Sequence, residues 1–280
     1  ASIWTDVAQS IVMILAMALL TVVCHSAIAP ITEITTRLEA IDPNLLSLTP
    51  VDASLGLLPY AIGWFIAGIG GVGQPHIIVR AMAVERADAI PAMRRTYFSW
   101  YIVFSTFTML VGLYARIHLN GVDFDAETAL PILAANHLAP ILVGIILASM
   151  FAATISTADS QVLACSASAT QDIAPAHRDN HSSAKLATVA VVLAAMGVAL
   201  VGPDSVFILV TVAWGLMTTC FAPLMIARCL DWAVDARAAI TACVLGTTSM
   251  LGWTHVLGLG EALYDGAVGF IVSMAIVAIA

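Results

Sequence analysis

Long apolar stretches without charged residues dominate the pattern along this chain. Asp, Glu, Lys and Arg are absent from eight runs: 7–32, 53–79, 96–115, 128–158, 186–203, 205–227, 238–260 and 266–280. A helix needs roughly 20 residues to cross a hydrocarbon layer of ~30 Å, and the first seven runs are long enough. The runs lack the polar and apolar alternation of outer-membrane barrel strands. The pattern therefore predicts an all-α multi-pass membrane protein.

Composition and charge support this prediction and give it an orientation. Apolar residues make up 61% of the 280 residues and charged residues 10%, against roughly 45–50% and about 25% in a typical soluble domain. If the loops alternate sides, one side receives only Arg37 and Arg116, and the other receives Arg80, Arg86, Arg94, Arg95, Arg178, Lys185, Arg228 and Arg237. The side richer in basic residues is cytoplasmic. We therefore expect the first helix to run outward and the 30–56 and 117–139 loops to be external. Because the basic residues are scattered over separate loops, no nucleic-acid partner is expected.

Residues 68–73 match the Gly-x-Gly-x-x-Gly fingerprint of nucleotide-binding loops. That fingerprint requires a preceding strand and a following helix, and here it lies inside an apolar run. Glycine costs about 1 kcal/mol and proline about 3 kcal/mol inside a helix, and Pro75 has no N–H to donate to the carbonyl of Gly71. The pattern predicts that the helix over 57–80 is broken here. Broken helices mark substrate or ion sites in secondary transporters, although glycines also permit close approach of another helix.

A second polar feature lies in the helix predicted over 140–170. Four residues at i, i+3, i+4 and i+7 share one face, and a carboxylate overlaps it: Ala153, Ser156, Thr157, Ser160 and Asp159. A carboxylate in an apolar span is a functional-site hypothesis by default. Oxygen ligands without His or Cys suit a hard cation rather than zinc. The alternative is that the hydroxyls bond to their own helix and Asp159 pairs locally; both interpretations stay open.

Asp6 stands at the cytoplasmic entrance of the first helix, where the helix dipole alone also favours it. If this helix packs against the 140–170 helix, a second oxygen cluster forms from Asp6, Ser156, Asp159 and Ser160. Two membrane aspartates also suit an intramembrane protease, but nothing else here supports peptide binding. We therefore expect no catalytic residues and no enzyme.

The five cysteines lie within or at the ends of apolar runs, with no Cys-x-x-Cys spacing: Cys24, Cys165, Cys220, Cys229 and Cys243. We interpret them as small packing residues. No transition-metal site is predicted from them, and the oxygen group described above suits a hard cation.

Five stretches, in this order, resemble the sodium/solute symporter family. They are "IWTDVAQ" (3–9), "GVGQPHIIVRAMA" (71–83), "ASMFAATISTADSQVLACSASATQDI" (148–173), "VAWGLMTTCFAP" (212–223) and "LYDGAVGF" (263–270). The resemblance covers essentially the whole chain. It implies a ten-helix core of two five-helix repeats with inverted topology, plus accessory helices.

The resemblance also implies how the chain is divided. Residues 1–29 hold the last helix of the first repeat (7–29), 30–56 form an external loop, 57–227 form the second repeat, and 228–280 form accessory transmembrane helices. The five helices of the second repeat are expected at 57–80, 96–116, 139–170, 184–203 and 205–227. The first four core helices are missing, so the resemblance implies an excerpt of a longer protein that does not transport by itself.

Site residues follow from the same resemblance. The main sodium site falls on the carbonyl of Ala153 and the hydroxyls of Ser156 and Thr157. A further sodium site of some members falls on Asp6, Ser156, Asp159 and Ser160. Asp159 replaces a serine of those members, which leaves the number of coupled ions open. The solute is expected beside the broken helix, at Trp64, Ala67, Gly71, Gln74 and Trp214.

The implied function is sodium-coupled symport of a small organic solute, an amino acid such as proline, by alternating access in the cell membrane. Proline-transporting members carry aromatic residues where this chain has Ala67 and Gly71, and Trp64 and Trp214 are the candidate replacements. Two alternatives stay open: the sensor domain of a signalling kinase, and a symporter for a carboxylate, a sugar or pantothenate. The expected partners are the solute, sodium ion, the lipid bilayer and the missing amino-terminal helices, with no cofactor other than the coupling ion.

Overall fold

The computed structural model describes residues 2–28, 30–47, 49–50, 53–177, 180–203, 205–260 and 262–280, and every regular element within them is a helix. Arg178, one of the basic residues used for the orientation, lies outside these ranges. The chain divides into two compact units, Ala1–Leu48 with Val84–Leu193 and Thr49–Ala83 with Ala194–Ala280.

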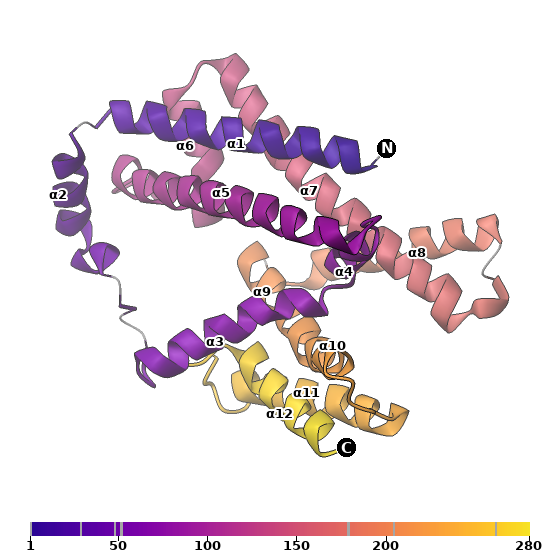
Figure 1. The fold of residues 1–280 in the computed structure, drawn as a ribbon. Helices are drawn as coiled ribbons and strands as arrows, with labels where there is room; N and C mark the ends of the chain where they lie inside the picture. The colour runs from indigo at the N-terminus through magenta and orange to yellow at the C-terminus, as the bar shows by residue number, and fades with distance from the viewer. Residues whose placement is uncertain are drawn as a thin grey trace. The chain divides into compact units, whose positions relative to one another are not determined.

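The first unit is a bundle built around helix α1. Its helices are α1 (Ser2–Ser26), α2 (Ile31–Ile41), α5 (Ile90–His118), α6 (Ala129–His137), α7 (Pro140–Ser168) and most of α8 (His181–Val201). Helix α1 packs against α5 and α7 (Figure 1). The core between these helices contains Leu20, Cys24, Tyr114, Leu133 and Ile146. In a bilayer such side chains stabilise the bundle through van der Waals packing, because lipid tails are as apolar as the side chains themselves.

The second unit carries the broken helix. Its elements are α3 (Leu57–Ile69), the short turn η2 (Gly70–Gly73), α4 (Pro75–Met82), α9 (Val206–Cys220), α10 (Ala222–Cys229), α11 (Ala236–His255) and α12 (Asp265–Ile279). Helix α12 packs against α9, α11 and α3. Small residues allow this close packing, because a Cβ added at Gly246 would lie 2.0 Å from Ser273 Oγ. Such small-residue contacts are typical of helix packing in membranes.

Five helical segments in the described residues are long and apolar enough to cross a membrane: Trp4–Ser26, Ala87–His118, Pro140–Ile173, His181–Val201 and Val206–Cys229. A sixth is added if the bent pair Leu57–Gly73 and Pro75–Met82 counts as one span. The prediction of an all-α multi-pass membrane protein is confirmed.

The carboxyl-terminal part differs from the sequence-based expectation of further long spans. The 238–260 run lies largely in α11, which is not among the candidate spans because its Thr, Ser and Gly residues lower its mean hydropathy. The last run forms α12, a shorter apolar helix of 15 residues. The assignment of 228–280 to accessory transmembrane helices stays a prediction.

The two segments expected as external loops are partly helical. Residues 30–56 contain α2, in which Ile34 and Leu38 are buried and Glu33 forms an ion pair with Arg37 one turn later. Residues 117–139 contain α6, with Leu133 and Ala134 buried. A scan for long apolar runs misses α2 because only one of its faces is apolar. Helix α6 instead lies inside the 128–158 run, where the chain is interrupted before Pro140 and α7 begins.

Residues 205–227 were expected to form one helix, but the chain is interrupted at Phe221, between α9 and α10. Pro223 explains the interruption because it has no N–H for the helical hydrogen bond to the carbonyl four residues earlier. Both α9 and α10 contact η2, so the interruption in α9–α10 lies against the interruption in α3–α4.

Candidate functional site

The predicted break in the helix over 57–80 is confirmed. Helix α3 ends at Ile69, residues Gly70–Gly73 form a tighter 3₁₀ turn, and α4 starts at Pro75 with a bend of 56°. Gln74 between them is extended, with φ −88° and ψ 110°. Its N–H donates to the carbonyl of Gly71 at 3.2 Å, the carbonyl that Pro75 leaves without a helical donor.

Helix α9 satisfies the backbone at this break. The indole Nε1 of Trp214 donates a hydrogen bond to the carbonyl oxygen of Ala67 at 2.7 Å. Thr218 is fully buried against Gly70, and a Cβ added at Gly70 would lie only 1.9 Å from Thr218 Oγ1. In contrast, a Cβ on Gly68 would meet nothing within 4 Å. The glycines therefore combine both roles that their pattern suggested, since Gly70 admits a neighbouring helix at the point where the span is broken.

Three of the five residues predicted to bind solute meet at the break. Ala67 and Gln74 are buried, at 9% and 6% exposure, and Trp214 bonds to the Ala67 carbonyl. Within the described part of the chain, the structure gives the Gln74 side-chain amide no hydrogen bond. Gly71 is half-buried and has open space beside it. The break therefore carries an amide side chain without a hydrogen bond to any described residue and, three residues earlier, a glycine with open space beside it.

The fifth predicted residue, Trp64, has a different neighbour. Its ring stacks on that of Tyr264 with centroids 5.7 Å apart, and Trp64 itself is 46% exposed. Tyr264 belongs to the same buried cluster as Ala67, and its hydroxyl lies 3.5 Å from the carbonyl oxygen of Thr211. Burial raises the pKa of Tyr264, and the charge of Asp265 raises it further. Tyr264 thus stays a neutral donor. Sequence reasoning did not select it, although it lies in one of the stretches that carry the resemblance.

We expect Trp214→Phe to destabilise the protein, because it removes the donor to the Ala67 carbonyl but keeps most of the ring. A buried carbonyl left without a donor costs about 1–3 kcal/mol. Thermal unfolding of the purified full-length protein measures the effect. Trp232→Phe is the matched control, since Trp232 lies in the exposed loop between α10 and α11. Equal unfolding temperatures for the two variants would contradict a structural role of the Trp214 hydrogen bond.

The predicted main sodium site forms a compact group of oxygens on α7. Ser156 Oγ and Thr157 Oγ1 both donate to the carbonyl oxygen of Ala153, at 3.0 and 3.1 Å. Ser160 Oγ donates in turn to the carbonyl of Ser156 at 2.9 Å. The hydroxyls thus bond to their own helix, which was the alternative to ion binding. A hydroxyl that donates a hydrogen bond still has two lone pairs on its oxygen. These bonds therefore hold the oxygens close together and leave lone pairs that can bind an ion.

The second predicted oxygen cluster depends on α1 and α7 being neighbours. These helices do pack against each other, and α1 carries Asp6 while α7 carries the other three residues. Asp6 is half-buried and Asp159 is exposed. The packing of α1 against α7 that the cluster requires is therefore present. Coordination of an ion by Asp6 stays a prediction.

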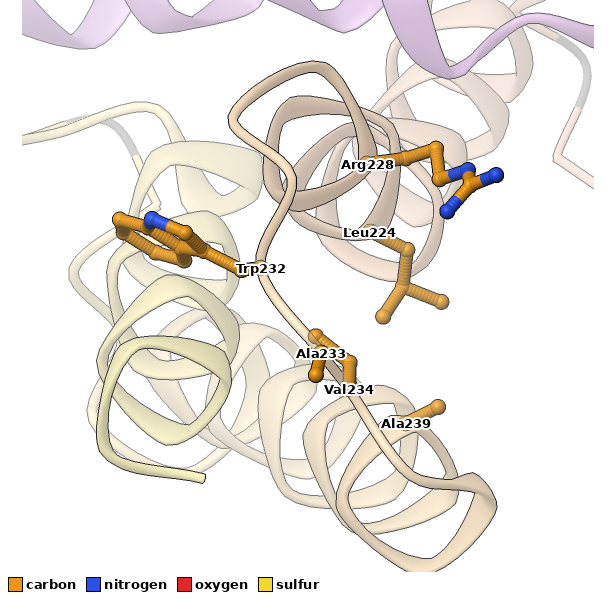
Figure 2. Close-up of a pocket in the computed structure, with 6 residues that line it drawn as sticks. All are labelled: Leu224, Arg228, Trp232, Ala233, Val234 and Ala239. Carbon is orange, nitrogen blue, oxygen red and sulfur yellow. The ribbon is translucent and has the colours of Figure 1, made fainter.

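A pocket of about 360 Å³ lies elsewhere in the second unit, where α10, the following loop and α11 meet (Figure 2). Its lining residues are Leu224, Arg228, Trp232, Ala233, Val234 and Ala239. None of these residues was predicted to bind sodium or solute. The pocket thus shares no lining residue with the broken helix, and we assign no function to it.

Comparisons with known proteins agree with the all-α membrane fold. The profile of the sodium:solute symporter family matches residues 1–275. The chain is 28% identical over 281 residues to the high-affinity proline transporter PutP of Bacillus subtilis, covering 97% of this chain and 58% of that protein. It is 29% identical over 286 residues to the sodium/proline symporter of Escherichia coli, and 30% identical to that of Salmonella typhimurium, in each case covering 96% of this chain and 55% of the relative. The chain thus spans about half the length of these curated relatives. No solved structure matches it.

Proposed function

The chain belongs to the sodium:solute symporter family, and from this premise we propose that it forms part of a symporter that couples sodium entry to uptake of proline or a related amino acid. The relatives that match it are named as proline transporters or sodium/proline symporters. Because the chain spans about half their length, the proposal concerns the full-length protein, in the cell membrane. The proposed partner of this chain within that protein is a set of further core helices, which the family resemblance places before it in the sequence. No cofactor other than the coupling ion and no enzymatic activity is part of the proposal.

The oxygen group on α7 is the observation that carries the proposal. The hydroxyl oxygens of Ser156 and Thr157 lie 3.0 and 3.1 Å from the carbonyl oxygen of Ala153, so three oxygens are grouped together. Oxygen ligands without nitrogen or sulfur suit a hard cation. When an ion binds, the two hydroxyl protons turn away from the carbonyl, and the lone pairs of all three oxygens face the ion. Asp6, Asp159 and Ser160 are the proposed ligands of a second ion, together with Ser156.

The broken helix is the proposed solute site. The positive end of the α4 dipole, at Pro75, suits the carboxylate of an amino acid. The free side-chain amide of Gln74 and the aromatic ring of Trp214 offer polar and apolar contacts beside it. Gly71 has open space beside it, whereas Ala67 is buried in a cluster with Tyr264. By the family resemblance, proline-transporting members carry aromatic residues at both positions.

In the proposed cycle, sodium stabilises the state that admits solute from outside, and the solute then binds before the helices rock to the inward-open state. Each sodium ion that enters with the membrane potential contributes ~2.3 kcal/mol per 100 mV. At a factor of ten per 1.36 kcal/mol, one ion supports roughly a 50-fold solute gradient. In this assignment α1 is the last helix of the first repeat. The five helices of the second repeat are α3 with α4, α5, α7, α8, and α9 with α10.

Uptake by the full-length protein in proteoliposomes tests the proposed function. We expect labelled proline to accumulate under an inward sodium gradient and not under an equal potassium gradient, with empty liposomes as the control. Unlabelled proline and related amino acids should compete, while pantothenate, a sugar and a carboxylate should not. If only pantothenate, the sugar or the carboxylate competes, that solute is the substrate and the proposed amino acid is not. Saturable binding without accumulation would instead favour the sensor alternative.

A further inference from the structure

The first unit contains a second group of metal-ligating side chains, which the proposed symport does not use. Cys24 of α1, His118 of α5 and His137 of α6 offer ligand atoms that all lie within 4.8 Å of one another. Neither sodium nor an amino acid calls for a thiol with two imidazoles. We propose that these three residues bind Zn²⁺ and thereby tie together the ends of the three helices.

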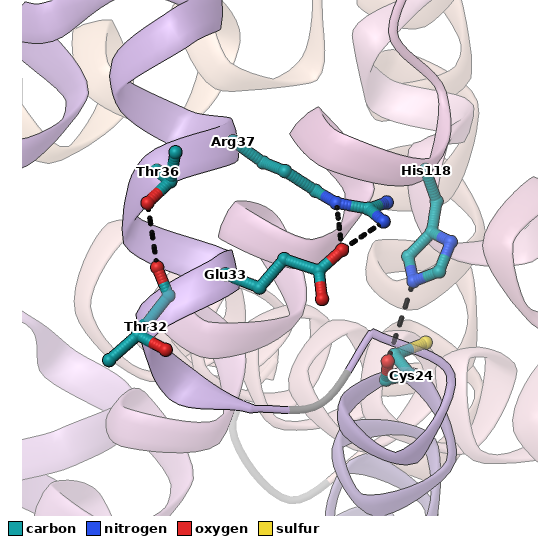
Figure 3. Close-up of polar contacts among 6 residues, drawn as sticks. All are labelled: Cys24, Thr32, Glu33, Thr36, Arg37 and His118. Atoms are coloured by element: carbon teal, nitrogen blue, oxygen red, sulfur yellow. Dashed lines mark hydrogen bonds and ion pairs between the residues drawn. The ribbon is translucent and has the colours of Figure 1, made fainter.

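The three side chains are held in place by the fold around them. His118 Nε2 lies 3.4 Å from the carbonyl oxygen of Cys24, which keeps the imidazole beside the thiol (Figure 3). The rings of His118 and His137 meet edge-to-face, with centroids 4.2 Å apart at 67°. Cys24 is completely buried, whereas both histidines are half-buried. The group is therefore fixed on its inner side and accessible to an ion through the imidazoles.

The helix dipoles at this place favour a cation. Cys24 lies in the last turn of α1, and His118 and His137 are the last residues of α5 and α6. The carboxyl end of a helix carries roughly half a negative charge, which stabilises nearby cations. The nearby cation Arg37 forms an ion pair with Glu33, so its charge is balanced (Figure 3). The carboxyl ends of the three helices thus give this place a negative electrostatic potential, which favours binding of a divalent cation.

The ligand types select the metal. One thiolate and two imidazoles suit Zn²⁺, or Cu(I), whereas Na⁺, Mg²⁺ and Ca²⁺ prefer oxygen. With bonds of about 2.3 Å to sulfur and about 2.0 Å to nitrogen, ligand atoms on one Zn²⁺ lie about 3.5 Å apart. Small side-chain rotations close the remaining gap from 4.8 Å. The Cys24 thiol releases its proton to solvent on binding, and water takes the fourth position.

The proposed site differs from the packing role of Cys24 and from the absence of transition metals that the sequence led us to expect. Cys24 and His118 are 94 residues apart, so no local spacing reveals the group. On the orientation predicted by the basic residues, these helix ends face the outside of the cell. An ion there would hold the outer end of α1 to α5 and α6.

Zinc titration of the purified, chelator-stripped full-length protein tests the proposal, with a coloured chelator as competitor and no sodium or solute present. We expect one Zn²⁺ per chain and an increase in unfolding temperature on binding. Cys24→Ser and His137→Gln should each weaken binding at least about tenfold, as expected for loss of one ligand. Matched controls are Cys165→Ser, at an exposed cysteine of α7, and His25→Gln, whose imidazole contacts the Tyr114 hydroxyl instead. Both controls should bind Zn²⁺ like the unchanged protein.

Cobalt substitution provides a second readout. Co²⁺ bound at this site should show a thiolate-to-metal charge-transfer band that disappears in Cys24→Ser and persists in His25→Gln. No zinc binding by the unchanged protein, or equal zinc binding by all four variants, would overturn the proposal. His137→Gln keeps the test valid if the buried Cys24 variant does not fold. Because neither sodium nor solute is needed, failure here is distinguishable from failure of the proposed symport.

Discussion

Gly70→Ala is expected to abolish most uptake by the full-length protein and to lower its stability. The added Cβ would lie 1.9 Å from Thr218 Oγ1 and 2.7 Å from Trp214 Nε1. Thr218 is fully buried, and Trp214 is held by its bond to the Ala67 carbonyl, so neither side chain can yield freely. Overpacking of this kind costs about 1–3 kcal/mol. It also pushes α9 away from the break at which we place the solute.

Gly68→Ala is the matched control for this prediction. Gly68 lies two residues earlier in α3, and a Cβ there would meet nothing within 4 Å. Alanine is favoured over glycine inside a helix by about 1 kcal/mol, so this variant should be at least as stable as the unchanged protein. Unfolding temperature and initial uptake rate are measured for both variants in the same preparation. Wild-type values for Gly70→Ala would show that α9 does not pack tightly against the break.

Ser156→Ala and Thr157→Ala are expected to raise the sodium concentration for half-maximal uptake by at least about tenfold each. Each substitution removes one hydroxyl oxygen from the group around the Ala153 carbonyl. Loss of one charge-assisted ligand contact worth about 1.5–3 kcal/mol corresponds to a tenfold or larger loss of affinity. Thr157→Ser keeps the hydroxyl and should keep the sodium dependence near that of the unchanged protein. Uptake measured over a range of sodium concentrations, with choline to maintain ionic strength, gives these values.

Thr154→Ala separates ion binding from helix stability. Its hydroxyl donates to the Met150 carbonyl at 3.0 Å, the same kind of bond that Thr157 makes. However, the Thr154 oxygen lies on the Met150 carbonyl, one turn before the Ala153 carbonyl that Ser156 and Thr157 share. We expect this variant to leave the sodium dependence unchanged. If Thr154→Ala and Thr157→Ala shift it equally, the hydroxyls act through the helix and not as ligands.

Much of the candidate site could be predicted from the sequence because its signals are local. Glycines followed by a proline disfavour a continuous helix whatever surrounds them, and the chain breaks where Gly70 and Pro75 predict. The shared face of Ser156 and Thr157 follows from helical geometry alone. The all-α class follows equally from the long uncharged runs.

What the sequence could not provide depends on contacts between distant residues. The bond from Trp214 to the Ala67 carbonyl and the stacking of Trp64 on Tyr264 join segments far apart in the chain. The group of Cys24, His118 and His137 likewise exists only after three helices pack together. Helix α2 was missed because it is short and only one of its faces is apolar, and α6 because it shares one uncharged run with α7.

Direct binding of radioactive sodium tests the central claim that the α7 oxygens hold the coupling ion. The purified full-length protein is compared with the double variant Ser156→Ala, Thr157→Ala, after thermal unfolding has shown that both are folded. We predict saturable sodium binding by the unchanged protein and loss of at least one ion per chain in the double variant. Equal sodium binding by both proteins would contradict the account.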